Sequence, residues 1–108
     1  MRSGTRKKTG KNKLYLEWMH TQVCFVTGRR PVTVHHVRFC GGPRIDTRTL
    51  PLIAELHMLG HEKYAEFGPC IERGKKVFEQ AHGVDIEAGI KHYQDLFTIE
   101  CGAFDTEN

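Results

Sequence analysis

The apolar positions in the first half of the chain follow two different periods. Over residues 13–22 they fall at helical spacing, which predicts a short helix with one buried face. The runs 23–26 and 32–37 are short, apolar and rich in β-branched residues, and the turn-forming segment 27–31 separates them. These two runs predict a β-hairpin, and the stretch 38–49, which contains Gly-Gly-Pro, predicts a loop.

In the second half of the chain the pattern predicts helices separated by breaks. A helix is expected over about 51–61 with a proline in its first turn, and Gly68-Pro69 interrupts the chain after it. Another helix is expected over about 71–81, closed by Gly83. Asp85 is the expected N-cap of a last helix that runs to about residue 97. This order predicts an α+β fold with one N-terminal helix, a hairpin, a loop, a helix and two C-terminal helices.

Composition divides the chain into three segments. The chain has 108 residues, 39% hydrophobic and 27% charged, which is typical of one globular domain, and we expect that domain over residues 13–100. Residues 1–12 are predicted to be a basic flexible arm, and residues 101–108 an acidic tail. The net charge of +3 is unevenly spread, because the first thirteen residues hold cations and no acid. These cations are Arg2, Arg6, Lys7, Lys8, Lys11 and Lys13.

This asymmetry favours a polyanionic partner, and Lys7, Lys8 and Lys11 are candidate DNA contacts; a merely solvated leader is the alternative. No stretch has the apolar length of a membrane span, and Glu17 interrupts the first apolar run, so no signal peptide or membrane partner is expected. The four cysteines are scattered without any C-x-x-C pair. We therefore expect a cytoplasmic location and reduced thiols.

Four of the seven histidines form a pattern. His35 and His36 are adjacent near the end of the second predicted strand, and His57 and His61 lie four apart on a predicted helix. Neighbours on a strand point to opposite faces, so the first two imidazoles are expected to have different roles unless the strand bends. Residues four apart on a helix share a face, from which two imidazoles can hold one divalent cation. Each pair alone is more often a surface or core feature, and only the combination indicates a metal site.

Three segments in this order resemble the ββα-metal (His-Me finger) motif of HNH endonucleases, especially the small phage-type proteins that include the Ref recombination-enhancing nucleases. The segments are Thr33-Val-His35-His36-Val-Arg38, Arg44-Ile-Asp46-Thr-Arg48-Thr-Leu-Pro51-Leu52 and His57-Met-Leu-Gly-His61. The resemblance covers roughly residues 14–97. The related reading of the last segment as a zinc protease motif fails, because Met58 stands where that mechanism needs a glutamate.

The resemblance implies a role for each histidine. His35, His57 and His61 would hold one divalent cation (Mg, Mn, Ni or Zn), and His36 would be the general base that deprotonates the attacking water. The assignment of His35 and His36 to these two roles is also open to reversal. The resemblance further implies cleavage of DNA to a 5′-phosphate and a 3′-hydroxyl. A role in phage or prophage recombination or DNA processing, a recombinase filament as partner and a homodimer are compatible with it.

The chain departs from the family pattern at two places. Many relatives carry a zinc knuckle made by two C-x-x-C pairs. Here Cys24 is followed three residues later by Thr27, and the positions of the second pair are Ile53 and Leu56, so no structural zinc is expected. We expect Ile53 and Leu56 to contribute apolar packing instead. The asparagine that gives the HNH motif its middle letter is also absent, and its place in this sequence falls near Arg48.

Charged residues of the predicted loop offer replacements for the missing Asn. Asp46 could accept the second ring proton of His36, and Arg48, Arg44 or Arg38 could clamp the phosphate. The sequence thus predicts a nuclease with His36, Asp46 and Arg48 as catalytic residues. Two alternatives stay open: an accessory nucleic-acid-binding protein of recombination with a decayed site, and a small interaction module whose histidines bind metal only structurally.

Overall fold

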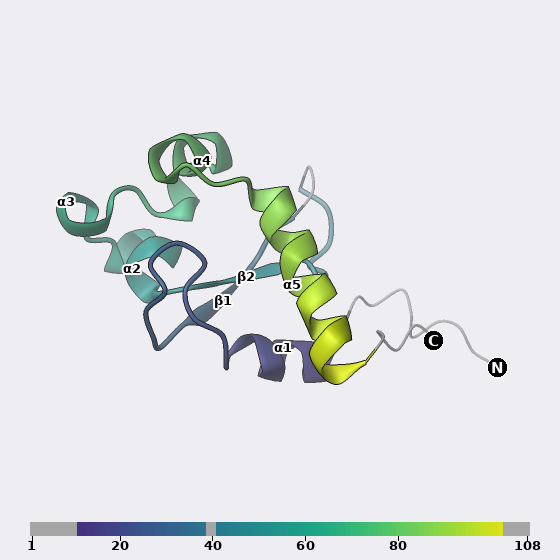
Figure 1. Cartoon of the computed structure of the whole chain (residues 1–108). Coiled ribbons are helices and arrows are strands. Elements are labelled where there is room, and N and C mark those ends of the chain that lie inside the picture. Colours follow the sequence, from purple (N-terminus) through teal and green to yellow (C-terminus); the bar gives the residue numbers. More distant parts are fainter. Residues whose placement is uncertain (1–10, 39–40, 103–108) are drawn as a thin grey trace.

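The computed structural model describes residues 11–38 and 41–102 and has an α+β fold. Short helices of α and 3-10 type surround one two-stranded antiparallel sheet (Figure 1). In chain order the elements are α1 (Lys13–Met19), β1 (Thr33–His36), β2 (Thr49–Leu52), α2 (Ala54–His57), η2 (Leu59–His61), α3 (Tyr64–Phe67), η3 (Ile71–Arg73), α4 (Lys75–His82) and α5 (Ile86–Cys101), where η marks a 3-10 helix. No helix in the described ranges is long and apolar enough to cross a membrane.

The sheet pairs β1 with β2, in the register His35 opposite Leu50 and His36 opposite Thr49. The prediction that residues 23–26 form the strand paired with residues 32–37 is therefore wrong, because the partner strand is β2. Residues 23–26 instead enter a tight turn, in which the Cys24 N–H donates to the Arg29 carbonyl at 2.9 Å. All four residues of β2 are buried, so this apolar segment makes the better partner for the half-buried β1.

The helix predicted over residues 51–61 is also wrong as a continuous element. Its first residues belong to β2, and α2 spans only four residues before Met58 adopts an extended conformation (φ −126°, ψ 137°). The Leu59 N–H, which would continue the helix, donates to the Glu72 carboxylate at 3.2 Å. A tertiary contact thus replaces the next helical hydrogen bond, and η2 continues in a different direction.

The C-terminal part agrees closely with the sequence prediction. The helix expected over 71–81 is present in part, because Gly74 (φ 130°, ψ 140°) separates the turn η3 from the helix α4. Gly83 ends α4 in the left-handed conformation (φ 65°, ψ 36°) that glycine adopts without strain. Asp85 caps α5, because its carboxylate accepts from the Ala88 N–H at 3.0 Å. The additional helix α3 lies before the predicted break at Gly68-Pro69.

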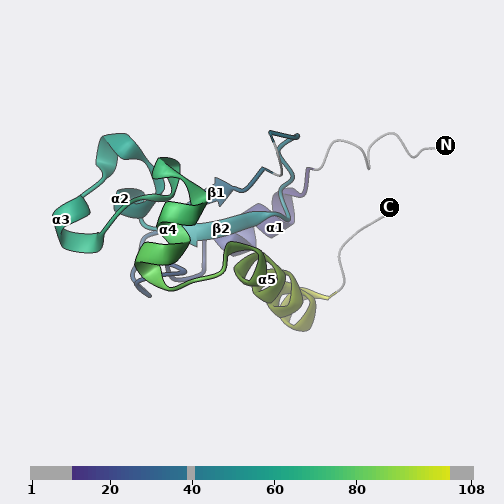
Figure 2. The ribbon, with the colours of Figure 1, turned by 90° about the horizontal axis from the view of Figure 1, so that it is seen from above.

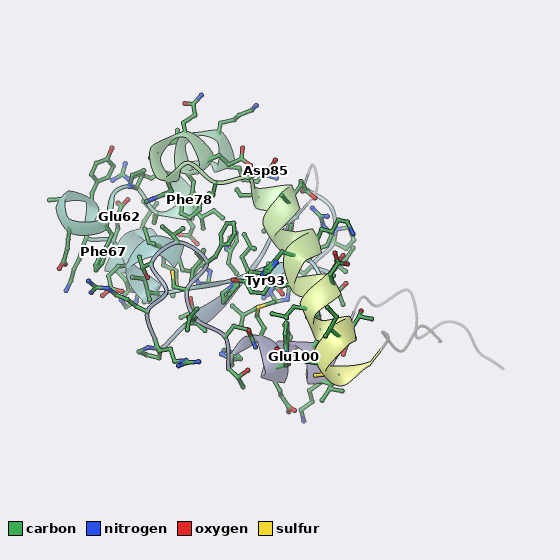
Figure 3. All side chains as sticks on the ribbon, in the orientation of Figure 1. Glu62, Phe67, Phe78, Asp85, Tyr93 and Glu100 are labelled. Carbon is green, nitrogen blue, oxygen red and sulfur yellow. The ribbon has the colours of Figure 1, made fainter. Side chains whose placement is uncertain are left out.

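The core has a layer of aromatic side chains between α1 and α5. The Tyr15 and Trp18 rings lie 4.9 and 5.2 Å from the Phe97 ring, and Tyr93, labelled in Figure 3, packs edge-on to Trp18. At the other end of the sheet α2, α3 and α4 gather together (Figures 1 and 2). The histidine-bearing strand β1 begins beside α2, where Thr33 contacts His57, and ends at His36, which contacts Asp46.

Close packing of α5 on the sheet requires a glycine. A Cβ atom placed on Gly89 would lie 2.6 Å from the Phe25 ring and 3.2 Å from Leu50. These distances are shorter than van der Waals contact, so α5 can approach β2 only without a side chain at this position. Gly89 thereby allows α5 to pack directly on Leu50 of β2 and on Phe25.

Candidate functional site

Strand β1 presents its two histidines to different surroundings. Thr33 and His35 share one face by the two-residue repeat of a strand, and His36 belongs to the other. His35 meets α2, whereas His36 meets the segment between the two strands. The imidazoles therefore have different partners, which makes different chemical roles available to them.

His36 is held between a carboxylate and a guanidinium. Its Nε2 lies 2.8 Å from Asp46 Oδ1, and its Nδ1 lies 3.1 Å from Arg44 Nη2. A guanidinium can only donate, so Nδ1 is the acceptor, and the ring proton of the neutral imidazole sits on Nε2 and is donated to Asp46. The basic atom of His36 is consequently Nδ1. The side chain of His36 is 13% exposed, so this atom is sheltered without being sealed from solvent.

Asp46 is itself fixed by the surrounding backbone. Its second carboxylate oxygen accepts from the Asn12 N–H at 2.7 Å, and its carbonyl accepts from the Thr49 hydroxyl at 2.9 Å. Asn12 also caps α1 by accepting from the Tyr15 N–H. The contact expected between Asp46 and His36 is thus present, and Asn12 and Thr49 hold Asp46 in place. The catalytic role of either residue stays a prediction.

His57 of α2 lies next to His35 of β1. The two rings are in edge-on contact, with centroids 4.9 Å apart. The Thr33 hydroxyl donates its proton to the Leu52 carbonyl at 2.8 Å, so its oxygen must accept from His57 Nδ1, 2.6 Å away. This contact puts the ring proton of His57 on Nδ1 and leaves the Nε2 lone pair available. Such a hydrogen bond to the remote ring nitrogen is typical of metal-binding histidines.

Both imidazoles of this pair are disposed to stay neutral. Burial, with the neighbouring His57 as a smaller cause, lowers the pKa of His35 to about 4. Burial likewise lowers the pKa of His57, against a smaller opposing effect of the Glu72 carboxylate. A metal ion binds the neutral form of imidazole, so at neutral pH no proton competes for these nitrogens. Two imidazoles also suit divalent transition metals, so the chemistry of this donor pair fits the expected cation.

His61 is not part of this pair as the structure stands. It ends η2 beyond the break at Met58, and its side chain is exposed. Because α2 stops at His57, the expectation that His57 and His61 share one helical face is wrong. Within the described ranges no three His, Cys, Asp or Glu side chains are gathered into a metal-binding group.

The basic residues that were predicted to contact DNA or its phosphate differ in their surroundings. Arg48 forms a two-pronged ion pair with Glu87 of α5, at 3.0 and 2.6 Å, rather than facing His36. Arg38 and Lys11 are exposed, and Lys7 and Lys8 lie outside the described residues. Of the three arginines expected to clamp a phosphate, only Arg44 contacts a histidine of the site.

Sequence reasoning missed three residues beside the histidine pair. Thr33 was detectable, because it lies two residues before His35 on the same strand face. Glu72 and Lys75 had no local signal: Glu72 comes from η3, and the Lys75 ammonium reaches from α4 to the Arg38 carbonyl at 3.0 Å. Both side chains contribute to the electrostatic surroundings of His35.

The positions of the family's zinc knuckle hold an apolar contact. Cys24, Ile53 and Leu56 are all part of the buried core, as expected for Ile53 and Leu56. Cys70 is also buried, Cys101 is exposed, and these cysteines are free thiols; Cys40 lies outside the described residues.

No protein-family model matches the chain, and the searches of curated proteins and of solved structures also returned no match.

Proposed function

We propose that this chain is a metal-dependent endonuclease of the HNH type that hydrolyses phosphodiester bonds in DNA. The main support is the His36 imidazole, whose only proton-accepting atom is identified by Asp46 and Arg44 and whose charge acts on both imidazoles of the His35–His57 pair. The element order β1, β2, α2, with two histidines on the first strand and His57 on the helix, is also the order of a ββα-metal motif.

In this mechanism His36 is the general base. Its Nδ1 takes a proton from the attacking water, while the Nε2 proton stays hydrogen-bonded to Asp46. The carboxylate then faces an imidazolium, which it stabilises by charge. Because Asp46 is held by Asn12, the imidazole keeps its orientation during the proton transfer.

Arg44 couples substrate binding to this base. In the structure its guanidinium covers Nδ1 of His36, and its side chain is exposed. A phosphate attracts a guanidinium more strongly than a neutral imidazole does, since the hydrogen bonds are then charge-assisted on both sides. Arg44 therefore turns to the scissile phosphate and frees Nδ1 for water.

His35 and His57 would hold the divalent cation. When bound, the cation supplies Lewis-acid stabilisation of the charge on the phosphate and the leaving oxygen. Thr33 keeps the Nε2 lone pair of His57 available, and the low pKa values of both imidazoles keep protons away. Lys75 adds a positive charge on the side of the sheet where His35 lies.

A plasmid assay tests this proposal. Wild-type protein with Mg²⁺, Mn²⁺, Ni²⁺ or Zn²⁺ is expected to nick or linearise plasmid DNA, and EDTA is expected to stop it. The His36→Ala variant should lose about 10²-fold or more in rate, because the positioned base is gone, while its affinity for DNA stays unchanged. His92→Ala, at an exposed position of α5, is the matched control and should cut like the wild type.

Two results would contradict the proposal. DNA binding without cutting under any of the four metals would support the accessory nucleic-acid-binding protein. A His36→Ala variant that cuts at the wild-type rate would show that His36 is not the base.

A further inference from the structure

We propose that a cleft beside the start of β1 binds an unpaired nucleotide of the DNA strand, with its base on the Phe67 ring and its phosphate on Arg29 and Arg30. This proposal rests on the proposed function, because it names the form of DNA that the site takes. It concerns the turn before β1 and the helix α3, which lie outside the histidine motif.

The cleft lies where the turn before β1 meets α2 and α3, and its volume is about 320 Å³. This volume is within the range of about 300–1,000 Å³ that is typical of small-ligand sites. Apolar and charged side chains line the cleft together, among them Val32, Ile53, Phe67, Arg29, Arg30 and Glu55. A lining of this kind suits a ligand that has both a flat apolar part and an anionic part, as a nucleotide does.

The two arginines of the cleft have charges available for an anion. In the described part of the chain Arg48 and Arg73 each form an ion pair with a glutamate, whereas neither Arg29 nor Arg30 forms one. Arg30 donates one hydrogen bond, to the Thr21 carbonyl at 3.3 Å, and both side chains are exposed. A guanidinium has five N–H donors in a fork that matches phosphate, so charge complementarity points to a phosphate group.

Phe67 offers a flat surface next to these charges. The Arg29 Cζ lies over the Phe67 ring, 5.2 Å from its centroid. The ring, labelled in Figure 3, is half-buried and packs against the core, which fixes its orientation. Aromatic rings and guanidinium planes both stack on nucleobases. We expect the base to take the place of the guanidinium on the ring, while Arg29 turns to the phosphate in a hydrogen bond that is charge-assisted on both sides.

A second arginine–aromatic contact shows what a purely structural pair looks like. The Arg73 Cζ lies over the Tyr64 ring, 5.3 Å from its centroid, but the Arg73 guanidinium also binds the Glu62 carboxylate at 2.8 Å. Arg73 is therefore held in place by an ion pair. Arg29 has no such ion pair in the described ranges, so it can leave the Phe67 ring when an anion is present.

The cleft adjoins the pair of histidines through Thr33. This residue lines the cleft, and its hydroxyl oxygen lies 2.6 Å from His57 Nδ1. A nucleotide in the cleft would therefore be close to the phosphate that is cut. A base in a duplex is stacked on its neighbours and can enter such a site only after it has left the stack. The cleft thus favours single-stranded or locally opened DNA.

Fluorescence anisotropy tests this proposal, with the full-length protein in EDTA and a labelled single strand or the corresponding duplex. Phe67→Leu should weaken single-strand binding by about 10-fold, as expected for the loss of one stacked base, and leave duplex binding unchanged. Tyr64→Leu is the matched control and should bind like the wild type. Leucine keeps apolar packing at position 67, and thermal melting checks the fold.

A second variant tests the phosphate contact. Arg29→Gln should weaken single-strand binding and reduce the slope of log K against log salt by about 0.7 for each lost phosphate contact. Its side chain is exposed, so the fold is expected to persist. Lys91→Gln, which removes the same charge from exposed α5, is the matched control and should have a smaller effect.

Three results would overturn the proposal. They are an unchanged single-strand affinity in Phe67→Leu, an equal loss for single strand and duplex in that variant, and an Arg29→Gln effect no larger than that of Lys91→Gln. Binding in EDTA does not depend on cutting. Protein that cuts no plasmid but loses single-strand affinity in Phe67→Leu would therefore support the nucleotide cleft and contradict the nuclease.

Discussion

At the scale of single residues, the site is organised by groups that have only one hydrogen-bonding choice. Arg44 can only donate, so it makes Nδ1 of His36 an acceptor. Thr33 has already given its proton to a carbonyl, so it makes Nδ1 of His57 a donor. The two imidazoles thereby expose different nitrogens, one suited to take a proton and one suited to bind a metal.

The low pKa of His35 predicts a pH-dependent stability. In the unfolded chain His35 takes up a proton near pH 6.5, but in the folded protein only near pH 4. As the pH falls through this window the unfolded state binds more protons, so the free energy of unfolding decreases. We expect the melting temperature of metal-free wild-type protein to fall between pH 6.5 and pH 4, and that of His35→Gln to fall less.

Thermal melting in EDTA at several pH values measures this difference. His92→Gln is the control and should follow the wild type, because the His92 side chain is exposed. If the melting temperatures of His35→Gln and wild type fall by the same amount between pH 6.5 and pH 4, burial of His35 does not disfavour its charged form.

At the scale of elements, α5 connects the aromatic layer to the segment that carries Asp46. Gln94 of α5 donates to the Thr47 carbonyl at 2.8 Å, and Glu87 binds the Arg48 guanidinium. Gly89 lets the same helix approach β2. Thr47 and Arg48, which follow Asp46, are therefore held by contacts that come from far along the chain.

This arrangement predicts a structural role for Arg48. Arg48→Ala should lower stability by up to about 1 kcal/mol, as expected for a partly exposed ion pair, with little change in the rate of DNA cutting. Glu87→Ala should have a similar effect, because it removes the other partner. Melting temperatures and the plasmid assay measure both. If Arg48→Ala abolishes cutting while Glu87→Ala does not, the sequence-based assignment of Arg48 as a catalytic residue is right.

At the scale of the whole molecule, charge is distributed unevenly along the sequence. The cations of residues 1–11 precede α1, whose N-cap Asn12 contacts Asp46. Asn12 is thus linked through Asp46 to the proposed general base, His36. DNA held by the basic segment would approach the molecule on the side of the site.

Deletion of residues 1–11 should weaken DNA binding and flatten its salt dependence. Each lost phosphate contact reduces the slope of log K against log salt by about 0.9 for duplex DNA. Fluorescence anisotropy with labelled DNA over a range of salt concentrations measures the slope. Deletion of residues 103–108, which removes acidic groups, is the control and should not weaken binding. Equal affinity and slope after deletion of 1–11 would show that the basic segment is a solvated leader.

The sequence alone determined the features that depend on local chemistry. Helical spacing predicted α1 and α5, Gly83 and Asp85 marked the ends of α4 and α5, and strand alternation predicted different roles for His35 and His36. Each of these follows from backbone geometry within a few residues. The expected contact between Asp46 and His36 came from the family resemblance, because Asp46 lies near the place of the family's missing Asn.

Tertiary structure decided which distant segments meet. Whether residues 23–26 or 49–52 pair with β1 depends on which apolar segment is buried on both sides, and local hydrophobicity does not distinguish them. The break at Met58, the Arg48–Glu87 ion pair and the hydrogen bond from Leu59 to Glu72 arise from contacts between residues far apart in sequence. The end of α2 is therefore a property of the packed chain, since a side chain from η3 takes a hydrogen bond that the α2 helix would otherwise have kept.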